Sequence, residues 1–289
     1  MLFTISFTKG DNLFAGNKIS LIIPAGRPER RQQLDNVVDK LIRGTVPPDE
    51  VVIIENISPA SRARNLGAQK STGDILIFAD DDIIIEQDDL FERVITTLLS
   101  SDDIGICGTS QDIPIDADRF QRAYRRQFDR TYTPIYDIVI DSDMATTLFC
   151  AIHRSDFFAA GGYDETLPAG EDNFLRHQIR KLGKRVVVAP NSIVYHALPK
   201  NFRELCNREK WYGSARAILA KRGDVPLGGV AITTKPKAFF YLIAQSLIFP
   251  FRFFYGGPSG KSFGWWPLRA IAHLLNSFYY ARSVLKGEA

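Results

Sequence analysis

Three consecutive aspartates, Asp80, Asp81 and Asp82, come directly after the apolar run 75–79. Adjacent carboxylates at the end of a buried strand repel one another and therefore need a positively charged partner. Because side chains alternate along an extended segment, Asp80 and Asp82 lie on one face. Carboxylate oxygens are the ligands that a hard divalent cation prefers, and such a cation can also bind a diphosphate. The pattern favours a metal site over a solvated acidic loop or a helix cap, since a cap needs only one aspartate.

A second acidic pair, Glu171 and Asp172, follows the breaker sequence 168–170 and opens a predicted helix over 171–182. A carboxylate held at such a position can take the proton of a hydroxyl nucleophile. Acidic residues in the first turn of a helix also interact favourably with the helix dipole. Helix capping is therefore the alternative to catalysis for this pair, and the context favours catalysis.

The elements that must position these carboxylates alternate between buried strands and helices. In chain order, strand and helix patterns alternate over 19–23, 30–42, 51–54, 63–70 and 75–79. This alternation is typical of a parallel sheet with right-handed crossovers. The strands end in polar residues at their carboxyl ends, where ligands of open α/β sheets bind. We therefore expect an α/β fold with its chemistry at 24–30, 55–58 and 80–82.

Further elements follow in the second half of the chain. A helix is expected after Asp89 and up to Leu99, and strands are expected over 104–108, 147–153 and 185–189. Residues 117–130 place five arginines at helical spacing: Arg119, Arg122, Arg125, Arg126 and Arg130. This basic face could bind anionic lipid headgroups or the pyrophosphate of an acceptor. The alternative is a solvated face whose arginines pair with nearby aspartates.

The composition of the chain changes after Lys235. Residues 238–251 are nearly uncharged, and residues 263–280 are rich in aromatic side chains. A helix that spans a bilayer needs ~20 apolar residues, and neither stretch reaches that length without a charge. Trp and Tyr beside Lys and Arg suit the headgroup region, so the pattern predicts two interfacial helices. The alternative is a helical hairpin that packs on the catalytic domain or on a second subunit.

Charge and cysteine content narrow the function classes. The net charge of +3 does not indicate a nucleic-acid-binding protein. The three cysteines are widely spaced and include no CxxC pair, which indicates a reducing compartment and no thiolate metal site. Lys9, Asp11 and Asn12 interrupt any signal-peptide pattern near the N-terminus. We expect a cytoplasmic protein that is peripheral on the cytoplasmic face of the membrane.

An ordered set of motifs resembles the family 2 glycosyltransferases of the GT-A fold. The opening strand and loop correspond to Ser20–Pro24 with Arg27. The A-R-N-x-G segment, the T/S-G-D step and the D-x-D motif of that family match, in order, Ala63–Gly67, Thr72–Asp74 and Asp80–Asp82. Its G-G-F-D-E segment, E-D pair and distal histidine match Gly161–Glu165, Glu171–Asp172 and Tyr195–His196. The matches keep the family order across about residues 18–215.

The resemblance implies a role for each matched residue. It implies that Asp80 contacts the nucleoside or ribose side of the donor, that Asp82 binds the metal and that Asp172 is the general base. His196 would be a further metal ligand or, alternatively, a structural residue. The expected site residues are catalytic Asp172 and Glu171; donor-binding Pro24, Arg27, Glu55, Arg64, Asn65, Asp80 and Asp81; and metal-binding Asp82, Asp80 and His196.

The resemblance also implies a fold and an organisation. We expect a Rossmann-like, mostly parallel sheet flanked by helices, with a C-terminal aromatic helical appendage. The expected domains are an N-terminal extension (1–17), a GT-A catalytic domain (18–232) and membrane-associating or packing helices (233–289). Within the catalytic domain, residues 18–110 would form the nucleotide-sugar half and residues 111–232 the acceptor half.

The expected function is an inverting glycosyltransferase assisted by Mg²⁺ or Mn²⁺. UDP-sugar is the expected donor, with GDP- and dTDP-sugars as alternatives, because Glu55 stands where many members carry the first aspartate of V-D-D-G-S. The expected acceptor is a glycan or a lipid-linked polysaccharide precursor. The Q-x-x-R-W motif of processive synthases is absent, which favours addition of a single sugar. A non-catalytic sugar-nucleotide-binding or scaffolding subunit and a nucleotidyltransferase are the alternatives.

Overall fold

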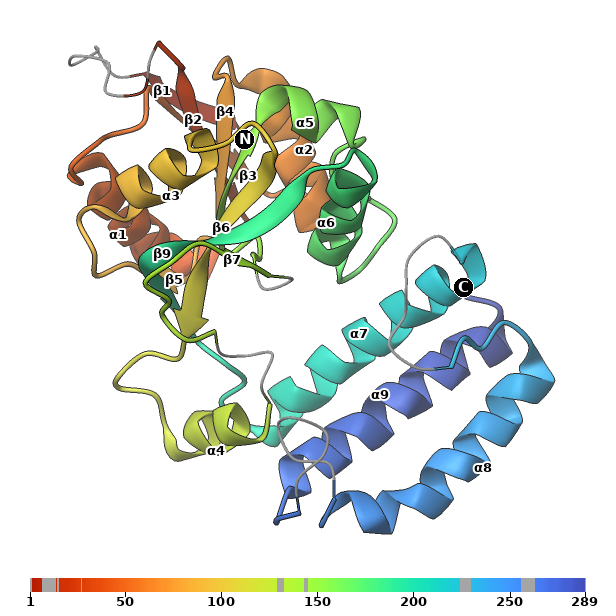
Figure 1. Cartoon of the computed structure of the whole chain (residues 1–289). Helices are drawn as coiled ribbons and strands as arrows, with labels where there is room; N and C mark the ends of the chain where they lie inside the picture. The colour runs from red at the N-terminus through yellow and green to blue at the C-terminus, as the bar shows by residue number, and fades with distance from the viewer. Residues whose placement is uncertain are drawn as a thin grey trace. The chain divides into compact units, whose positions relative to one another are not determined.

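The computed structural model describes residues 2–6, 14, 16–26, 28–128, 133–142, 145–223, 230–255 and 263–288. The chain divides into two compact units. Unit 1 consists of Met1–Pro114, Thr133–Glu165 and Glu171–His196, and unit 2 of Ile115–Tyr132, Thr166–Gly170 and Ala197–Ala289. Unit 1 contains the sheet, and unit 2 contains a group of helices (Figure 1).

The sheet of unit 1 has the strand order β1-β3-β2-β4-β8-β6-β9-β5, and β7 pairs with β9. The strands are β1 (Leu2–Ser6), β2 (Ile19–Ala25), β3 (Glu50–Glu55), β4 (Ile75–Ala79), β5 (Ile83–Ile84), β6 (Ile104–Asp112), β7 (Ile140–Asp141), β8 (Phe149–His153) and β9 (Arg185–His196). Strands β3, β2 and β4 are parallel to one another, as are β6 and β9, and β8 lies antiparallel between the two sets. Five strands therefore run in one direction, which confirms the predicted mostly parallel sheet.

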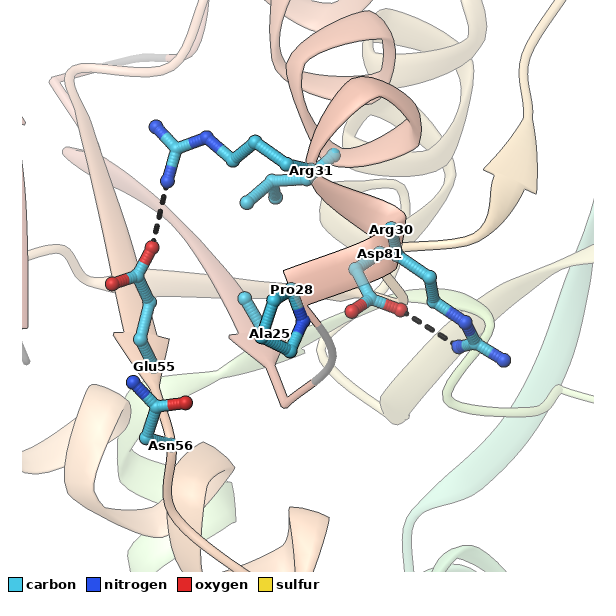
Figure 2. A pocket seen from close by; sticks show the side chains of 8 residues that line it. Ala25, Pro28, Arg30, Arg31, Glu55, Asn56 and Asp81 are labelled. Carbon is cyan, nitrogen blue, oxygen red and sulfur yellow. Dashed lines mark hydrogen bonds and ion pairs between the residues drawn. The ribbon is translucent and has the colours of Figure 1, made fainter.

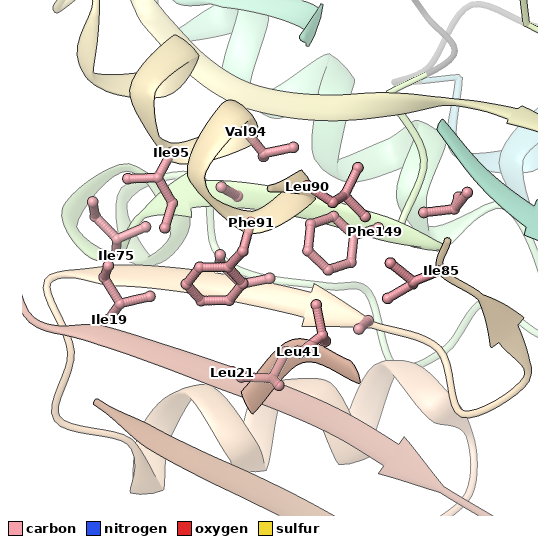
Figure 3. Close-up of a cluster of buried hydrophobic side chains, with 14 of the residues drawn as sticks. Ile19, Leu21, Leu41, Ile75, Ile85, Leu90, Phe91, Val94, Ile95 and Phe149 are labelled. Carbon is pink, nitrogen blue, oxygen red and sulfur yellow. The ribbon is translucent and has the colours of Figure 1, made fainter. Parts of the chain in front are cut away.

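Helices cover both faces of this sheet. They are the 3₁₀ turn η1 (Pro28–Arg30), α1 (Arg31–Ile42), α2 (Ala60–Lys70), α3 (Leu90–Leu99), α5 (Arg154–Ala159) and α6 (Glu171–Lys181). On one face, α1 and α3 pack on the sheet, and Phe91 of α3 lies in the same core as Leu21 of β2 and Phe149 of β8 (Figure 3). On the other face, α2, α5 and α6 pack against residues such as Ile22. Neighbouring residues of β2 thus enter opposite cores, which explains the continuous apolar runs of the sequence.

Some elements differ from the sequence expectations. Strand β1 lies within the expected N-terminal extension and pairs antiparallel with β3. Strand β9 continues to His196 instead of ending at 189. The continuation passes through an irregularity in the β6–β9 pairing and the positive φ of Asn191, so Pro190 does not end the strand. This longer strand carries His196 to the edge where the aspartates lie.

Unit 2 is built from α4 (Arg119–Gln127), α7 (Phe202–Arg222), α8 (Lys235–Arg252) and α9 (Pro267–Lys286). Helices α7, α8 and α9 lie side by side around a core that includes Ala217, Tyr280 and Ala281 (Figure 1). Gly213 allows close approach of α9, since an added Cβ would lie 2.8 Å from the carbonyl oxygen of Asn276. None of the helices in the described ranges has the length and hydropathy needed to cross a membrane.

Candidate active site

Side chains from several strand ends meet at one edge of the sheet in unit 1. Because β3, β4 and β9 run in the same direction, Glu55, Asp80–Asp82 and His196 all lie at the carboxyl edge. Strand β5 then pairs antiparallel with β9, and its Ile83 is opposite His196. This pairing brings the Asp82 Oδ1 atom to 3.5 Å from the His196 Nε2 atom. Asp82 and His196, two of the three predicted metal ligands, are therefore neighbours.

The Arg30 guanidinium lies between two of the three aspartates. Its Nη1 atom is 2.9 Å from Asp81 Oδ1 and 2.6 Å from Asp82 Oδ2. Burial alone would lower the pKa of Arg30, but the charges of Asp82 and Asp81 outweigh that effect and raise it. Burial also raises the pKa of Asp81, despite its hydrogen bond with Arg30. A positive charge thus stabilises the carboxylates at this position, as their spacing in the sequence requires.

Arg64 links the aspartates at the strand end to the acidic pair of α6. Its Nη2 atom is 2.6 Å from Asp80 Oδ1, and its Nη1 atom is 2.9 Å from Glu171 Oε1. The Arg64 side chain is only 4% exposed and lies over the Tyr163 ring. Burial disfavours its charge, but Asp80 and Glu171 more than compensate and raise the pKa of Arg64. One buried cation therefore fixes both acidic groups.

Asn65 fixes the loop that precedes α6. Its Nδ2 atom donates to the Tyr163 carbonyl at 2.8 Å and to Glu165 at 2.9 Å, and its Oδ1 atom accepts from the Tyr163 amide at 2.9 Å. Gly162, with φ of 71°, lies against this amide, and an added Cβ would be 2.9 Å from Asn65 Oδ1. The A-R-N and G-G-Y-D-E segments therefore form one hydrogen-bonded support beneath the site.

Glu171 and Asp172 are adjacent, yet their environments shift their pKa values in opposite directions. Burial raises the pKa of Glu171, although Arg64 partly opposes that shift. Burial would also raise the pKa of Asp172, but the charge and hydrogen bond of Arg176 and the backbone amide of Asn173 lower it overall. The Asp172 oxygens lie 2.8 Å from Arg176 Nη1 and 2.7 Å from the Asn173 amide. Asp172 is thus held in its ionised form, as a proton acceptor must be.

A pocket of about 220 Å³ opens beside the aspartates. It is lined by Ala25, Pro28, Arg30, Arg31, Leu34, Glu55, Asn56 and Asp81. Figure 2 shows the Arg31–Glu55 ion pair, at 2.7 Å, and the Arg30–Asp81 pair on opposite sides of Ala25 and Pro28. The pocket therefore has charged groups on both sides and apolar groups such as Ala25 and Pro28 between them, so it can take a ligand with polar groups.

Comparison with known proteins decides the family. The model of the family described as "Glycosyltransferase like family 2" matches residues 29–214. The chain belongs to this family. The matched segment contains Asp80–Asp82, Glu171–Asp172 and His196. The protein is therefore an enzyme, a glycosyltransferase.

Solved structures show the same fold. The mannosyltransferase PcManGT from Pyrobaculum calidifontis, in complex with GDP-Man and Mn²⁺, has a TM-score of 0.56 and 12% sequence identity, over 94% of this chain and 88% of that chain. A mycobacterial protein has a TM-score of 0.51 and 17% identity, over 76% of this chain and 80% of that chain. No curated protein matches the chain. These likenesses confirm the predicted GT-A fold of the glycosyltransferase.

The structure groups the predicted site residues of the glycosyltransferase unevenly. Glu55 and Asp81 line the pocket, whereas Pro24 is buried within β2 and the adjacent Ala25 lines the pocket instead. Arg27 lies outside the described residues. Arg64 contacts Asp80 and Glu171, and Asn65 contacts Tyr163. The predicted contacts of Arg64 and Asn65 with the donor stay predictions.

The predicted metal ligands do not form a closed set. Among the residues that the structure describes, no group of three or more His, Cys, Asp or Glu side chains is placed to hold a metal ion. Asp82 and His196 are adjacent, while Asp80 is paired with Arg64. A metal ion bound here would need further ligands from the substrate of the enzyme. Mg²⁺ commonly takes such ligands from substrate phosphates.

Sequence reasoning missed two cations that organise this site. The roles of Arg30 and Arg176 depend on partners brought close by folding. Arg30 contacts Asp81 across 51 sequence positions. The Arg176–Asp172 spacing of four residues on one helix is a signal that could have been read from the sequence.

Proposed function

We propose that this glycosyltransferase transfers a sugar from a nucleotide-sugar donor to an acceptor hydroxyl by direct displacement, with inversion at the sugar carbon. The observation that carries the proposal is the placement of two separate acidic groups around Arg64. The group at Asp80–Asp82 belongs to the donor side, and the group at Glu171–Asp172 to the acceptor side. One carboxylate is held ionised as a base, and direct displacement requires no second protein nucleophile.

On the donor side, the residues fit a divalent cation, Mg²⁺ or Mn²⁺. Asp82 and His196 supply an oxygen and a nitrogen 3.5 Å apart, and the Arg30 guanidinium already lies beside the Asp82 carboxylate as a stand-in for a cation. We infer that Asp82 and His196 would hold the ion and that the donor's diphosphate would complete its ligands. When bound, the cation would stabilise the negative charge that grows on the leaving diphosphate. The solved mannosyltransferase with GDP-Man and Mn²⁺ supports both the class of donor and the metal.

On the acceptor side, Asp172 would take the proton of the attacking hydroxyl. Its two oxygens accept hydrogen bonds from Arg176 and the Asn173 amide, and each oxygen keeps a lone pair for a further bond. The side chain is 24% exposed, so a ligand can reach it. Arg176 is itself buried and also donates to the Ala145 carbonyl, which fixes the orientation of the base. Asp172 is therefore both oriented and ionised before substrate arrives.

Calorimetry with nucleoside diphosphates, in Mn²⁺ and in EDTA, tests the donor site. We expect at least one nucleoside diphosphate to bind in Mn²⁺, with weaker binding in EDTA and in Asp82→Ala. Asp88→Ala is a matched control, because Asp88 is an exposed aspartate that pairs with Lys40. Absence of nucleotide binding under all conditions would contradict the proposed function and favour a scaffolding role.

We further propose that the acceptor lies at a membrane surface and is a lipid-linked or polysaccharide precursor. Helix α8 and the residues after it expose large apolar side chains: Phe239, Phe240, Ile243, Leu247, Ile248, Phe251, Phe254, Tyr255, Phe263 and Trp265. An apolar face of this size marks an interaction site. The sequence from 225 to 287 contains no Asp or Glu, but it contains Lys235, Lys237, Arg252, Lys261, Arg269, Arg282 and Lys286.

This charge pattern favours an anionic lipid surface as the partner. Each Lys or Arg near such a surface contributes about 1 kcal/mol of attraction, and aromatic side chains favour the headgroup boundary. The helix would lie in the plane of the interface. The cytoplasmic side, expected from the sequence, stays a prediction.

Flotation with vesicles that contain anionic phospholipid tests this part of the proposal. We expect the full chain to float with anionic vesicles and to float less with neutral ones or in high salt. Full-length protein that stays at the bottom with both kinds of vesicle would overturn membrane association and leave the donor site unaffected.

A further inference from the structure

The Arg30 side chain is held differently from that of Arg64, which also contacts the aspartates at the strand end. Arg64 uses two nitrogens, one on Asp80 and one on Glu171, and its side chain is only 4% exposed. Arg30 is 29% exposed, and both of its ion pairs use the single atom Nη1. Its Nη2 and Nε atoms make no hydrogen bond or ion pair with the residues that the structure describes. Arg30 therefore keeps donors available for a ligand, whereas Arg64 is committed to its two carboxylates.

Arg30 belongs to the wall of the pocket at the sheet edge. It ends the 3₁₀ turn η1 and lines the pocket together with Asp81, as Figure 2 shows. A nucleotide sugar carries a diphosphate, and a guanidinium binds phosphate oxygens through its planar set of N–H donors. The location of Arg30 therefore fits contact with the diphosphate of a donor. This inference rests on the proposed donor site.

The same guanidinium opposes a divalent cation that binds without a diphosphate. Its Nη1 atom is 2.6 Å from Asp82 Oδ2, while the Oδ1 atom of the same carboxylate is 3.5 Å from His196 Nε2. A cation held by Asp82 and His196 would thus share one carboxylate with Arg30. Two positive charges at such a short separation repel each other, and salt screens them little because the carboxylate is partly buried. A diphosphate, which is negatively charged, is attracted by both.

We propose that Arg30 makes the donor site selective by charge: its guanidinium weakens the binding of a bare divalent cation and strengthens the binding of a nucleoside diphosphate. The two effects have opposite signs because the two ligands have opposite charges. A structural role, in which Arg30 only holds Asp81 and Asp82 in place, would weaken the binding of both ligands when Arg30 is lost. The sign of the change in cation affinity therefore separates the two roles.

Two substitutions of Arg30 separate its charge from its shape. Arg30→Met removes the charge and keeps an unbranched side chain. Arg30→Lys retains the charge, and its single amine can replace the single nitrogen that now contacts both carboxylates. Arg43→Met is the matched control, because Arg43 directly follows α1, is 81% exposed and lies 3.9 Å from Asp39. Circular dichroism melting confirms that the three variants fold.

Two titrations of the full chain measure the two affinities separately. Electron paramagnetic resonance of free Mn²⁺ measures binding of the metal without nucleotide. Calorimetry with GDP, UDP, dTDP, ADP and CDP, in EDTA and in Mn²⁺, measures binding of the nucleoside diphosphates.

The two affinities should move in opposite directions in Arg30→Met. We expect the affinity for Mn²⁺ alone to rise by about tenfold or more, because a repelling charge is removed. The affinity in EDTA for the nucleotide that binds most tightly should fall by about 10–100-fold, as for loss of a hydrogen bond to a charged group. Arg30→Lys should remain closer to the unmodified protein, and Arg43→Met should match it in both titrations.

The outcomes separate this inference from the proposed function. An affinity for Mn²⁺ alone that is equal or lower in Arg30→Met would overturn the role of Arg30, and nucleotide binding in Mn²⁺ would still establish the donor site. Equal affinities in Arg30→Lys and Arg30→Met would overturn the dependence on charge. Absence of binding of every nucleotide by the unmodified protein, in Mn²⁺ and in EDTA, would overturn the proposed function itself, and the inference with it.

Discussion

The carboxyl edge of the sheet in unit 1 and helix α8 in unit 2 depart from ordinary side-chain distribution in opposite ways. At the sheet edge, Arg64 and Arg176 are buried, and each is paired with a carboxylate. On α8, Ala238 is buried, whereas Phe240, Leu247 and other large apolar side chains are exposed. Burial of charge and exposure of apolar surface both cost stability.

The difference indicates two separable tasks. The sheet edge uses buried cations to hold carboxylates in fixed positions and protonation states, which serves chemistry. Helix α8 leaves apolar surface exposed, where a lipid bilayer or a protein partner can bind. Changes at the sheet edge should therefore alter transfer and stability but not vesicle binding. Changes on α8 should do the reverse.

Removal of the base should give the largest effect. Asp172→Asn should reduce sugar transfer by about 10²–10⁴-fold, because the attacking hydroxyl loses its proton acceptor. Nucleotide binding and vesicle flotation should remain at their original levels. Transfer is measured by release of nucleoside diphosphate, and binding by calorimetry. Equal transfer by the variant would remove Asp172 from the role of base.

Removal of the cation shared by the two acidic groups should mainly affect stability. Arg64→Met leaves Asp80 and Glu171 without their common partner, and such a loss at a buried pair costs about 3–5 kcal/mol. Both carboxylates retain some exposure, so we expect the lower part of that range. Urea unfolding measures the change.

Arg62→Met is the matched control for this substitution. Arg62 lies on the same helix, α2, but is exposed. Its loss should change the free energy of unfolding by less than about 0.5 kcal/mol. Equal stability of the two variants would show that Arg64 does not support the site.

The architecture at the sheet edge could largely be predicted from the sequence, and the reason is local. Apolar runs such as 75–79 followed by Asp80 report both a buried strand and its polar end. The carboxyl ends of parallel strands meet at one edge, so the gathering of Glu55, Asp82 and His196 follows from topology. Family resemblance supplied the order of the motifs.

The finer arrangement could not be predicted, because it depends on partners far apart in sequence. Arg30 was one of several arginines after the first strand, and its contact with Asp82 depends on the 3₁₀ turn at 28–30. The adjacency of Asp82 and His196 depends on the two-residue strand β5, which is too short to show a pattern. The support that Asn65 gives to Tyr163 could not be predicted, because the two residues lie 98 positions apart.

Charged substitutions on α8 should give an effect of intermediate size. They should change vesicle binding, and they should leave sugar transfer unchanged. Phe240→Asp with Leu247→Asp changes two side chains that are 68% and 69% exposed. Because burial of each such side chain contributes about 1.5–3 kcal/mol, partition onto anionic vesicles should fall by at least about tenfold. The free energy of unfolding and calorimetric nucleotide binding should change little.

A matched control tests whether position on α8 is decisive. Ile115 is also a highly exposed apolar residue, but it lies outside the helices of unit 2. Ile115→Asp should float as the unmodified chain does. Equal loss of flotation in both variants would indicate a general effect of charge instead of a specific face.

The smallest expected effect concerns the opposite pKa shifts of Glu171 and Asp172. The pKa of Glu171 is raised in the folded state, so its contribution to stability is present below the unfolded pKa and is lost as pH rises through the folded one. The pKa of Asp172 is lowered, so its contribution is present above the unfolded pKa and is lost as pH falls through the folded one. Relative to the unmodified protein, Glu171→Gln should therefore gain stability as pH rises above about 4, whereas Asp172→Asn should lose stability as pH rises toward about 4 from more acidic values. Urea unfolding at several pH values measures both slopes. Slopes of the same sign would contradict the different roles of the two residues, in which Asp172 is held ionised and ionisation of Glu171 is disfavoured. The assignment of Asp172 as the base would then rest on the kinetics of Asp172→Asn alone.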